Sequence, residues 1–176
     1  NSIIINKRNS KSYSIWLMPE SNVKDQLKNV IYTLSNDFGG PIFEPHVTLV
    51  SSFLGSEKEL LQKTEIISKT IKPFEIFFSH IGYIDNFFRS LFLIVKVSIE
   101  LKLAREIACK ELNWTDNDYM PHLSIAYGDY DKKKKERMIS TVDIMPNRFL
   151  VDHIFLAHND EIRLEWNVIR RFKLGE

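Results

Sequence analysis

Apolar and polar residues alternate along several short segments of this chain, and between those segments apolar residues recur every three or four positions. Alternation is typical of strands, and the longer spacing is typical of helices. The pattern predicts strands at 13–18, 44–53, 74–84, 91–97, 120–127, 148–158 and 162–174. It predicts helices at 23–38, 57–71, 99–112 and 131–141. Strands and helices are thus mixed along the whole chain.

Local signals mark the ends of the predicted helices. Gly39 and Gly40 end the first helix, because glycine adopts backbone conformations that stop a helix. Ser56–Glu59 has the sequence of a capping box and begins the second helix. Ser98 can cap the third helix through its hydroxyl oxygen.

The connections between predicted strands are short. Residues 85–90 join two strands in a hairpin, and a turn at 159–161 joins the last two strands in another. No segment rich in proline, glycine or serine divides the chain. We therefore expect residues 1–176 to form a single domain with no independent boundary.

A strand and a helix are followed twice by the same five-residue pattern. Pro45–Leu49 (PHVTL) and Pro121–Ile125 (PHLSI) match by type at every position: proline, histidine, aliphatic, hydroxyl, aliphatic. Residues two apart on a strand share a face, so the histidine and the hydroxyl of each copy point the same way. The duplication predicts two similar lobes that face each other, each contributing one histidine and one hydroxyl.

Two opposed pairs of this kind suit a reaction at phosphorus. A neutral imidazole can take a proton from water while a protonated one gives a proton to the departing oxygen. We therefore interpret His46 and His122 as the catalytic pair. Thr48 and Ser124 would donate hydrogen bonds to the non-bridging phosphate oxygens, where charge accumulates. This division of roles needs neither a metal nor another cofactor, and the interpretation depends on the repetition because a lone histidine is more often structural.

The two motifs also resemble the paired signatures of the two-histidine (2H) phosphoesterase superfamily. A wider similarity, over about 13–174, is to its eukaryote-type cyclic nucleotide phosphodiesterase branch; it includes Tyr13–Glu20, Asn86–Leu93 and Pro121–Gly128. The resemblance implies a bilobed α+β fold in which two antiparallel sheets line a central cleft, with helices outside. It also implies metal-independent hydrolysis of ADP-ribose 1″,2″-cyclic phosphate or of nucleoside 2′,3′-cyclic phosphates, the latter to 2′-phosphates.

The same resemblance implies roles for individual residues. His122 would be the base that activates water and His46 the acid, although the near-symmetry of the motifs leaves this direction open. Tyr127 matches a tyrosine beside the phosphate. Strict alternation would turn Tyr127 away from His122, so this role requires the strand to bulge or end near Gly128.

An aromatic pair and a cysteine complete the comparison with the family. Phe87 and Phe88 match aromatic residues that approach the base, and a hairpin tip folded back on the core is the alternative interpretation. Some plant members contain disulfides, which a single cysteine, Cys109, excludes within this chain. We expect Cys109 to be a buried, inert thiol.

The overall composition narrows the possible partners. The chain has 24 Lys and Arg against 23 Asp and Glu, so it lacks the basic field typical of a protein that binds long nucleic acid. We interpret the basic run Lys132–Lys135 as a solvated helix face. No apolar run has the length of a membrane span, and no disulfide can form. We expect a cytoplasmic monomer whose partner is a small nucleotide substrate, with no membrane partner.

Two alternatives remain open at this point. One is a 2H phosphodiesterase that acts on oligonucleotides, either at 2′-5′ linkages or at RNA 3′ ends. The other is a nucleotide-binding module that has kept the cleft but lost turnover. Motifs for nucleoside triphosphates, dinucleotides and serine hydrolases are absent from the sequence, which argues against those classes.

Overall fold

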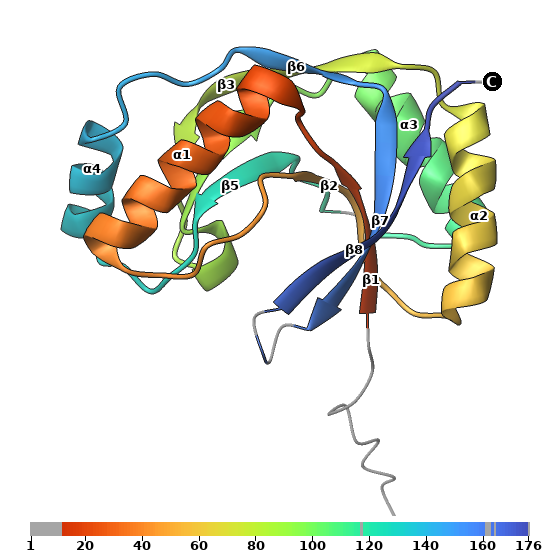
Figure 1. Ribbon diagram of the computed structural model, residues 1–176, viewed down its shortest axis with the longest axis horizontal. Helices are drawn as coiled ribbons and strands as arrows, with labels where there is room; N and C mark the ends of the chain where they lie inside the picture. Colours follow the sequence, from red (N-terminus) through yellow and green to blue (C-terminus); the bar gives the residue numbers. More distant parts are fainter. Residues whose placement is uncertain (1–11, 117, 161–162, 164, 176) are drawn as a thin grey trace, which may run out of the picture.

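The structure is a computed structural model that describes residues 12–116, 118–160, 163 and 165–175. Its elements follow the predicted order of strands and helices (Figure 1). They are β1 (Ser12–Leu17), α1 (Ser21–Phe38), β2 (Val47–Phe53), α2 (Glu57–Thr70), β3 (Phe74–Gly82), the 3₁₀ helix η2 (Phe87–Arg89), β4 (Leu91–Val95), α3 (Ile99–Leu112), β5 (His122–Ala126), α4 (Lys132–Ser140), β6 (Arg148–Val151), β7 (His153–Asp160) and β8 (Glu165–Lys173).

The strands form one eight-stranded sheet in the order β6-β3-β4-β5-β2-β1-β7-β8. Every neighbouring pair is antiparallel. The central pair, β5 and β2, is joined only through Val47 and Leu123, so the sheet consists of two four-stranded halves. The first half is β2-β1-β7-β8 and the second half is β6-β3-β4-β5. The predicted α+β fold is confirmed, and its two predicted sheets are the halves of one curved sheet (Figure 1).

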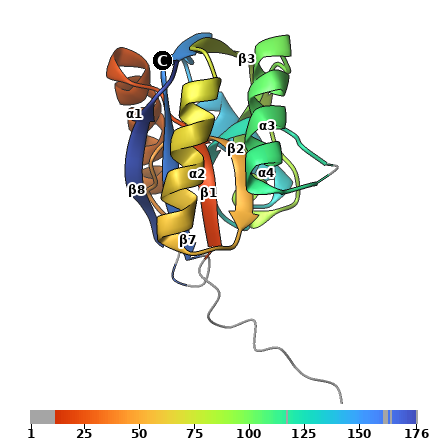
Figure 2. The same cartoon turned by 90° about the vertical axis from the view of Figure 1, so that its right-hand side faces the viewer.

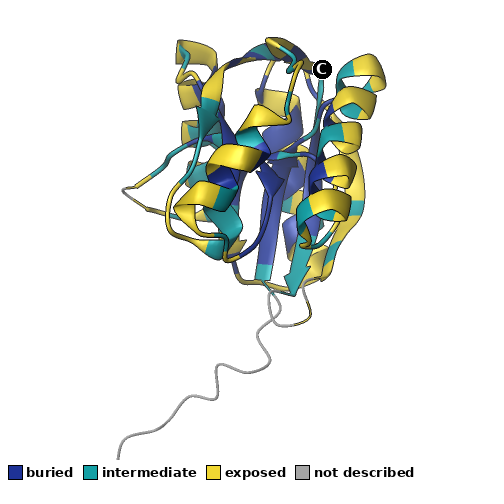
Figure 3. Cartoon of the chain, turned by 90° about the vertical axis from the view of Figure 1, so that its left-hand side faces the viewer, coloured by how far each residue is buried: buried dark blue, intermediate teal, exposed yellow. Residues whose placement is uncertain are grey.

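Each half-sheet is covered in part by a helix that follows a strand of the other half. α1 follows β1 of the first half but packs against β5 of the second half. α3 follows β4 of the second half but packs against β2 of the first half, beside α2 (Figure 2). In Figure 1, α1 and α4 lie on one side of the molecule while α2 and α3 lie on the other. Viewed from the α1 side, exposed helix surfaces cover buried strands (Figure 3).

The predicted signals at the helix ends act as expected. Gly39 has a φ of 85° and its N–H donates to the carbonyl of Ser35 at 2.9 Å, which ends α1. Ser56 accepts the Glu59 N–H at 3.3 Å and so begins α2. The hydroxyl of Ser98 accepts the N–H of Leu101 at 3.1 Å at the start of α3.

Two predictions about the second half of the chain were wrong. The segment 148–158 is not one strand, because β6 pairs with β3 while β7 pairs with β1 and β8. The chain crosses from one half-sheet to the other at Asp152, between β6 and β7. Lys135 is not solvated, since it is buried and its Nζ donates to the carbonyl of Ile84 at 2.9 Å.

Two further features bear on the sequence predictions. The antiparallel pairing of β7 with β8 is confirmed. Of the turn predicted at 159–161, Asn159 and Asp160 belong to β7, and residue 161 lies outside the described residues. Within the described ranges, the helices are all too short or too polar to span a membrane.

Candidate active site

The single residue pair that joins the two half-sheets lies at the centre of both repeated motifs. Val47 and Leu123 are opposite each other in antiparallel register, and both are fully buried. In that register, the histidine of each motif lies beside the hydroxyl residue of the other. The side chains of these four polar residues project from the opposite face of the sheet and line one cleft of about 200 Å³. The four residues are His46, Thr48, His122 and Ser124.

Both imidazoles are held in the same way. Nδ1 of His46 lies 2.8 Å from the carbonyl oxygen of Glu44, and Nδ1 of His122 lies 2.8 Å from that of Met120. A carbonyl oxygen can only accept, so Nδ1 of each ring carries a hydrogen. In each histidine, Nε2 is therefore the atom left for proton transfer.

An aromatic side chain supports each histidine from the neighbouring strand. The ring of Trp16 stacks on His46 with centroids 3.7 Å apart, and Phe92 contacts His122 edge-on at 5.3 Å. Trp16 is the strand partner of Thr48, and Phe92 is the strand partner of Ser124. The internal repeat thus extends to the residues that fix each imidazole plane. Trp16 itself lines the cleft.

Burial keeps both imidazoles neutral in the free protein. Burial lowers the pKa of His46 to about 4; the Glu44 carbonyl opposes this effect, and the nearby His122 adds to it. Burial also lowers the pKa of His122, with the Met120 carbonyl opposing and the charge of Arg89 adding. An anion bound between the rings would raise both values by favouring the charged form. A phosphate group is thus suited to create the protonated member of the pair.

The two hydroxyl residues are not equivalent. Within the described ranges, the Thr48 hydroxyl has no hydrogen-bond partner, while the Thr48 carbonyl accepts the Tyr119 hydroxyl at 2.8 Å. The Ser124 hydroxyl instead donates to the carbonyl of Phe88 at 3.0 Å, and Ser124 is buried. Of these two residues, only Thr48 has a hydroxyl proton free for a ligand, which departs from the symmetry of the motifs.

Tyr127 reaches the cleft because β5 ends at Ala126, which provides the strand end that this placement required. Its ring stacks on Phe43 with centroids 3.9 Å apart. Burial raises the pKa of Tyr127, and a hydrogen bond with the side chain of Ser124 partly offsets the rise. The phenol is therefore neutral and can act as a hydrogen-bond donor beside Ser124.

The two phenylalanines that the family resemblance paired are placed differently. Phe88 lines the cleft and meets Trp166 edge-on, with centroids 6.1 Å apart. Phe87 stacks beside Tyr127 at 6.5 Å and packs against the core. The described residues that line the cleft include Phe88 but not Phe87, so the folded-back alternative describes Phe87.

Sequence reasoning did not predict a group of small polar residues at one end of the cleft. The pairing of β2 with β1 shifts register twice, and Ser52 has a φ of 59°. Such bulges turn consecutive side chains to one face, so Ser51 and Ser52 both line the cleft. They lie with Ser14 and Asn159, which are joined by a hydrogen bond of 2.5 Å. No local pattern in the sequence signalled this irregularity, because the register shifts depend on the pairing with β1.

Arg89 is another cleft residue that was not predicted from the sequence. It belongs to the stretch that carried the family resemblance, but no role was predicted for it. Arg89 follows Phe88 in η2 and lines the cleft near His122. Among the described residues that line the cleft, it is the one with a formal charge at neutral pH. The cleft therefore has an electrostatic preference for anions.

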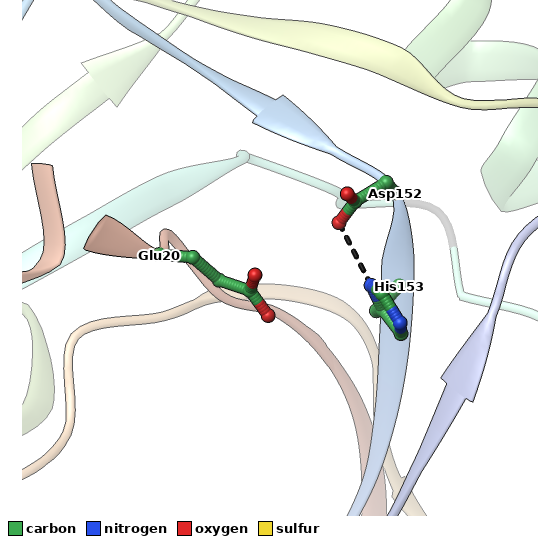
Figure 4. Close-up of side chains that lie close together, drawn as sticks. All are labelled: Glu20, Asp152 and His153. Atoms are coloured by element: carbon green, nitrogen blue, oxygen red, sulfur yellow. Dashed lines mark hydrogen bonds and ion pairs between the residues drawn. The ribbon is translucent and has the colours of Figure 1, made fainter.

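A cluster outside the cleft contains groups that commonly bind metals. The potential ligand atoms of Glu20, Asp152 and His153 lie within 4.8 Å of one another (Figure 4). No pattern in the sequence predicted this cluster. Arg171 lies 3.0 Å from the Glu20 carboxylate and 3.2 Å from Nδ1 of His153, so a positive charge is already present. We interpret the cluster as an ion-pair network that ties the start of α1 to β7 and β8.

Comparisons with known proteins agree with the site and the fold. The family model "Cyclic phosphodiesterase-like protein" matches residues 11–175. A cyclic phosphodiesterase from Arabidopsis thaliana is 28% identical over 125 residues, which cover 70% of this chain and 69% of that protein. A 2′,3′-cyclic-nucleotide 3′-phosphodiesterase from Yarrowia lipolytica is 26% identical over 157 residues, with coverages of 66% and 73%.

Solved structures show the same fold at low sequence identity. Escherichia coli LigT complexed with 3′-AMP has a TM-score of 0.62 at 12% identity, covering 96% of this chain and all of that chain. TT0787 of Thermus thermophilus has a TM-score of 0.64 at 16% identity, with coverages of 94% and 99%.

The chain belongs to the cyclic phosphodiesterase-like protein family, and with it to the 2H phosphoesterases, as the doubled motif predicted. This membership also confirms the predicted enzyme class, that of a cyclic phosphodiesterase.

Proposed function

We propose that this protein hydrolyses nucleoside 2′,3′-cyclic phosphates to 2′-phosphates, or ADP-ribose 1″,2″-cyclic phosphate, without a metal ion. The observation that carries the proposal is the pair of imidazoles in one cleft, each with Nδ1 held by a backbone carbonyl and Nε2 left free. The relatives from Arabidopsis thaliana and Yarrowia lipolytica, whose names specify cyclic phosphodiester chemistry, support it.

The proposed reaction is a single displacement at phosphorus. One neutral imidazole removes a proton from water as the water oxygen forms a bond to phosphorus. The bond between phosphorus and the ring oxygen that leaves, the 3′ oxygen of a nucleotide, breaks at the same time. The other imidazole, in its protonated form, gives its proton to that oxygen. Each of these proton transfers is typically worth about 10²–10⁴ in rate.

The charge of Arg89 near His122 supports the assignment that the family resemblance implies, with His122 as the base and His46 as the acid. Arg89 lowers the pKa of His122, and so favours the neutral form that a base needs. His46 then acts as the acid, and the phosphate anion must raise its pKa from about 4 for it to be protonated. The catalytic cycle therefore begins with substrate binding, which charges His46.

The size of the cleft argues against an oligonucleotide as the substrate. A volume of about 200 Å³ lies below the range of about 300–1,000 Å³ typical of pockets for drug-sized ligands. The near-zero net charge of the chain also offers little attraction for a long phosphate backbone. An oligonucleotide would have to lie mostly outside this cleft.

A product assay tests the proposed function. The protein is incubated in excess chelator with adenosine 2′,3′-cyclic phosphate, ADP-ribose 1″,2″-cyclic phosphate and a 2′-5′-linked oligoadenylate. We expect one of the two cyclic phosphates to be opened, and the nucleotide to give the 2′-phosphate. Cleavage of the oligonucleotide alone would favour the alternative phosphodiesterase, whereas tight binding without any hydrolysis would favour the binding module.

A further inference from the structure

The two halves of the active site use their hydroxyl residues differently, and one expected phosphate donor is therefore missing. The motifs predict one hydroxyl donor to the phosphate from each half. Thr48 fits that role, whereas the hydroxyl proton of Ser124 is engaged by the Phe88 carbonyl. The half that contains His122 therefore offers the neutral phenol of Tyr127 but no charged donor from its motif.

The 3₁₀ helix η2 is fixed at that position by its own backbone. The carbonyl of Phe88 accepts the Ser124 hydroxyl, and the carbonyl of Phe87 accepts the N–H of Gly128 at 3.0 Å. The Arg89 carbonyl accepts the N–H of Ile84 at 3.2 Å. Each of the three η2 carbonyls thus has a partner, so the segment that carries Arg89 is anchored beside the cleft.

Arg89 has the properties of the missing donor. It is half-buried, it lines the cleft, and it is close enough to His122 to lower the pKa of that imidazole. No ion pair of Arg89 occurs among the described residues. A guanidinium group presents several N–H donors in a planar fork that matches phosphate oxygens.

We propose that Arg89 binds the non-bridging oxygens of the phosphate under attack, on the side of His122, while Ser124 holds η2 in place. Thr48 and Arg89, rather than Thr48 and Ser124, would then be the phosphate donors of the two halves. This inference rests on the proposed phosphodiester chemistry and extends it to a further residue. It makes the duplicated site asymmetric in charge as well as in hydrogen bonding.

Arg89→Gln and Arg89→Lys test the role of the guanidinium, with Arg137→Gln as a matched control. Arg137 is exposed on α4 and does not line the cleft, so its replacement removes the same charge elsewhere. On adenosine 2′,3′-cyclic phosphate we expect Arg89→Gln to lower kcat/KM by about 10²–10³, the usual loss for one donor to a developing oxyanion. Arg89→Lys should recover part of this loss, and Arg137→Gln should match the parent protein.

A binding measurement separates this inference from the proposed function. Titration with inorganic phosphate, followed by the NMR signals of the imidazoles, should show binding to the parent protein and markedly weaker binding to Arg89→Gln. Tighter phosphate binding by the parent protein than by Arg89→Gln, without hydrolysis of any cyclic phosphate, would contradict the proposed function but would support the phosphate site at Arg89.

Two results would overturn the inference. One is an Arg89→Gln variant with parental kcat/KM and parental phosphate affinity. The other is a loss confined to a substrate that carries an additional 5′-phosphate, because Arg89 would then contact a second phosphate instead of the reacting one.

Discussion

The atoms that decide proton transfer at this site are the two Nε2 nitrogens, and their position depends on the Nδ1 hydrogen bonds of His46 and His122. Asparagine can place an amide N–H close to the position of Nδ1 while lacking any group at Nε2. Replacement of either histidine by asparagine is therefore a sharper test than alanine, because the hydrogen bond to the carbonyl can persist.

A substrate with an activated leaving group distinguishes the acid from the base. A p-nitrophenyl phosphodiester of a nucleotide needs no protonation of the phenolate as it leaves. If His46 is the acid, His46→Asn should recover at least about tenfold more of its lost activity on this substrate than His122→Asn does. Measurement of kcat/KM for both variants, on the p-nitrophenyl diester and on adenosine 2′,3′-cyclic phosphate, shows which histidine is the acid. Recovery by His122→Asn instead would reverse the two roles.

The lowered pKa of the half-buried His46 also makes stability depend on pH. Its pKa is about 4 in the folded protein against 6.5 ordinarily, so the unfolded chain binds a proton first as the pH falls. The free energy of unfolding is therefore highest above about pH 6.5 and declines towards about pH 4, by at most about 3 kcal/mol from this group. His46→Asn should remove most of that decline. Urea unfolding at about pH 7.5 and about pH 4.5 measures it.

The exposed His80 provides the control for this measurement. His80→Asn should lose stability between the two pH values as the parent protein does. Equal declines in the parent, His46→Asn and His80→Asn proteins would contradict the pKa assigned to His46.

Prediction from the sequence succeeded for residues in the repeated motif and failed for Arg89. The alternation of buried and cleft-facing positions around Val47 and Leu123 is local, so the sequence shows it directly. Arg89 reaches the cleft because its helix is held by Ser124 and Gly128, which are distant in the sequence. A lone arginine in a connection between strands carries no comparable local signal.

Among the elements, β2 has the most demanding role, because it must leave β5 immediately after the pair that joins the half-sheets. Two side chains then satisfy its carbonyls: the Tyr119 hydroxyl donates to Thr48 at 2.8 Å, and the Arg105 guanidinium donates to Leu49 at 2.6 Å. Arg105 also lies 3.9 Å from the centre of the Tyr119 ring and pairs with Asp116. This group positions Thr48 without touching the substrate.

Removal of one hydroxyl tests that positioning role. Tyr119→Phe should lower the free energy of unfolding by about 1 kcal/mol and kcat by about fivefold, because Thr48 loses a fixed backbone. Ser56→Ala, which removes the cap of α2 far from the cleft, should cost about 1 kcal/mol of stability with kcat unchanged. Urea unfolding and steady-state kinetics measure both effects. An equal fall of kcat in the two variants would contradict a specific role for Tyr119.

Among the elements, the sequence predicted most strands and helices and the two hairpin pairs, but not the pairing of strands that are distant in the sequence. Residues 148–158 have a continuous apolar pattern, yet the structure divides them between two half-sheets. The register shifts of β2 are also set by its neighbour β1, so no local pattern shows that Ser51 and Ser52 share the cleft. A local pattern of apolar and polar residues does not show which distant segments pair in the sheet.

For the molecule as a whole, the exchange of α1 and α3 between the half-sheets links the two lobes. α1 and α3 each cover the half-sheet that does not contain the strand they follow, and one cluster of buried residues includes core residues of both halves. We therefore expect a single cooperative unfolding transition, consistent with the prediction of one domain. Urea transitions followed by far-ultraviolet circular dichroism and by tryptophan fluorescence should coincide. Two separate midpoints would show that the lobes unfold independently.

The central claim is that two half-buried imidazoles from opposite halves perform the hydrolysis of a cyclic phosphate. The most direct measurement is turnover of adenosine 2′,3′-cyclic phosphate in excess chelator by the parent protein, His46→Asn, His122→Asn and the double variant. We predict hydrolysis by the parent protein and a loss of about 10²–10⁴ for each single variant, with folding unchanged by circular dichroism. Parental turnover by the folded double variant would contradict the account.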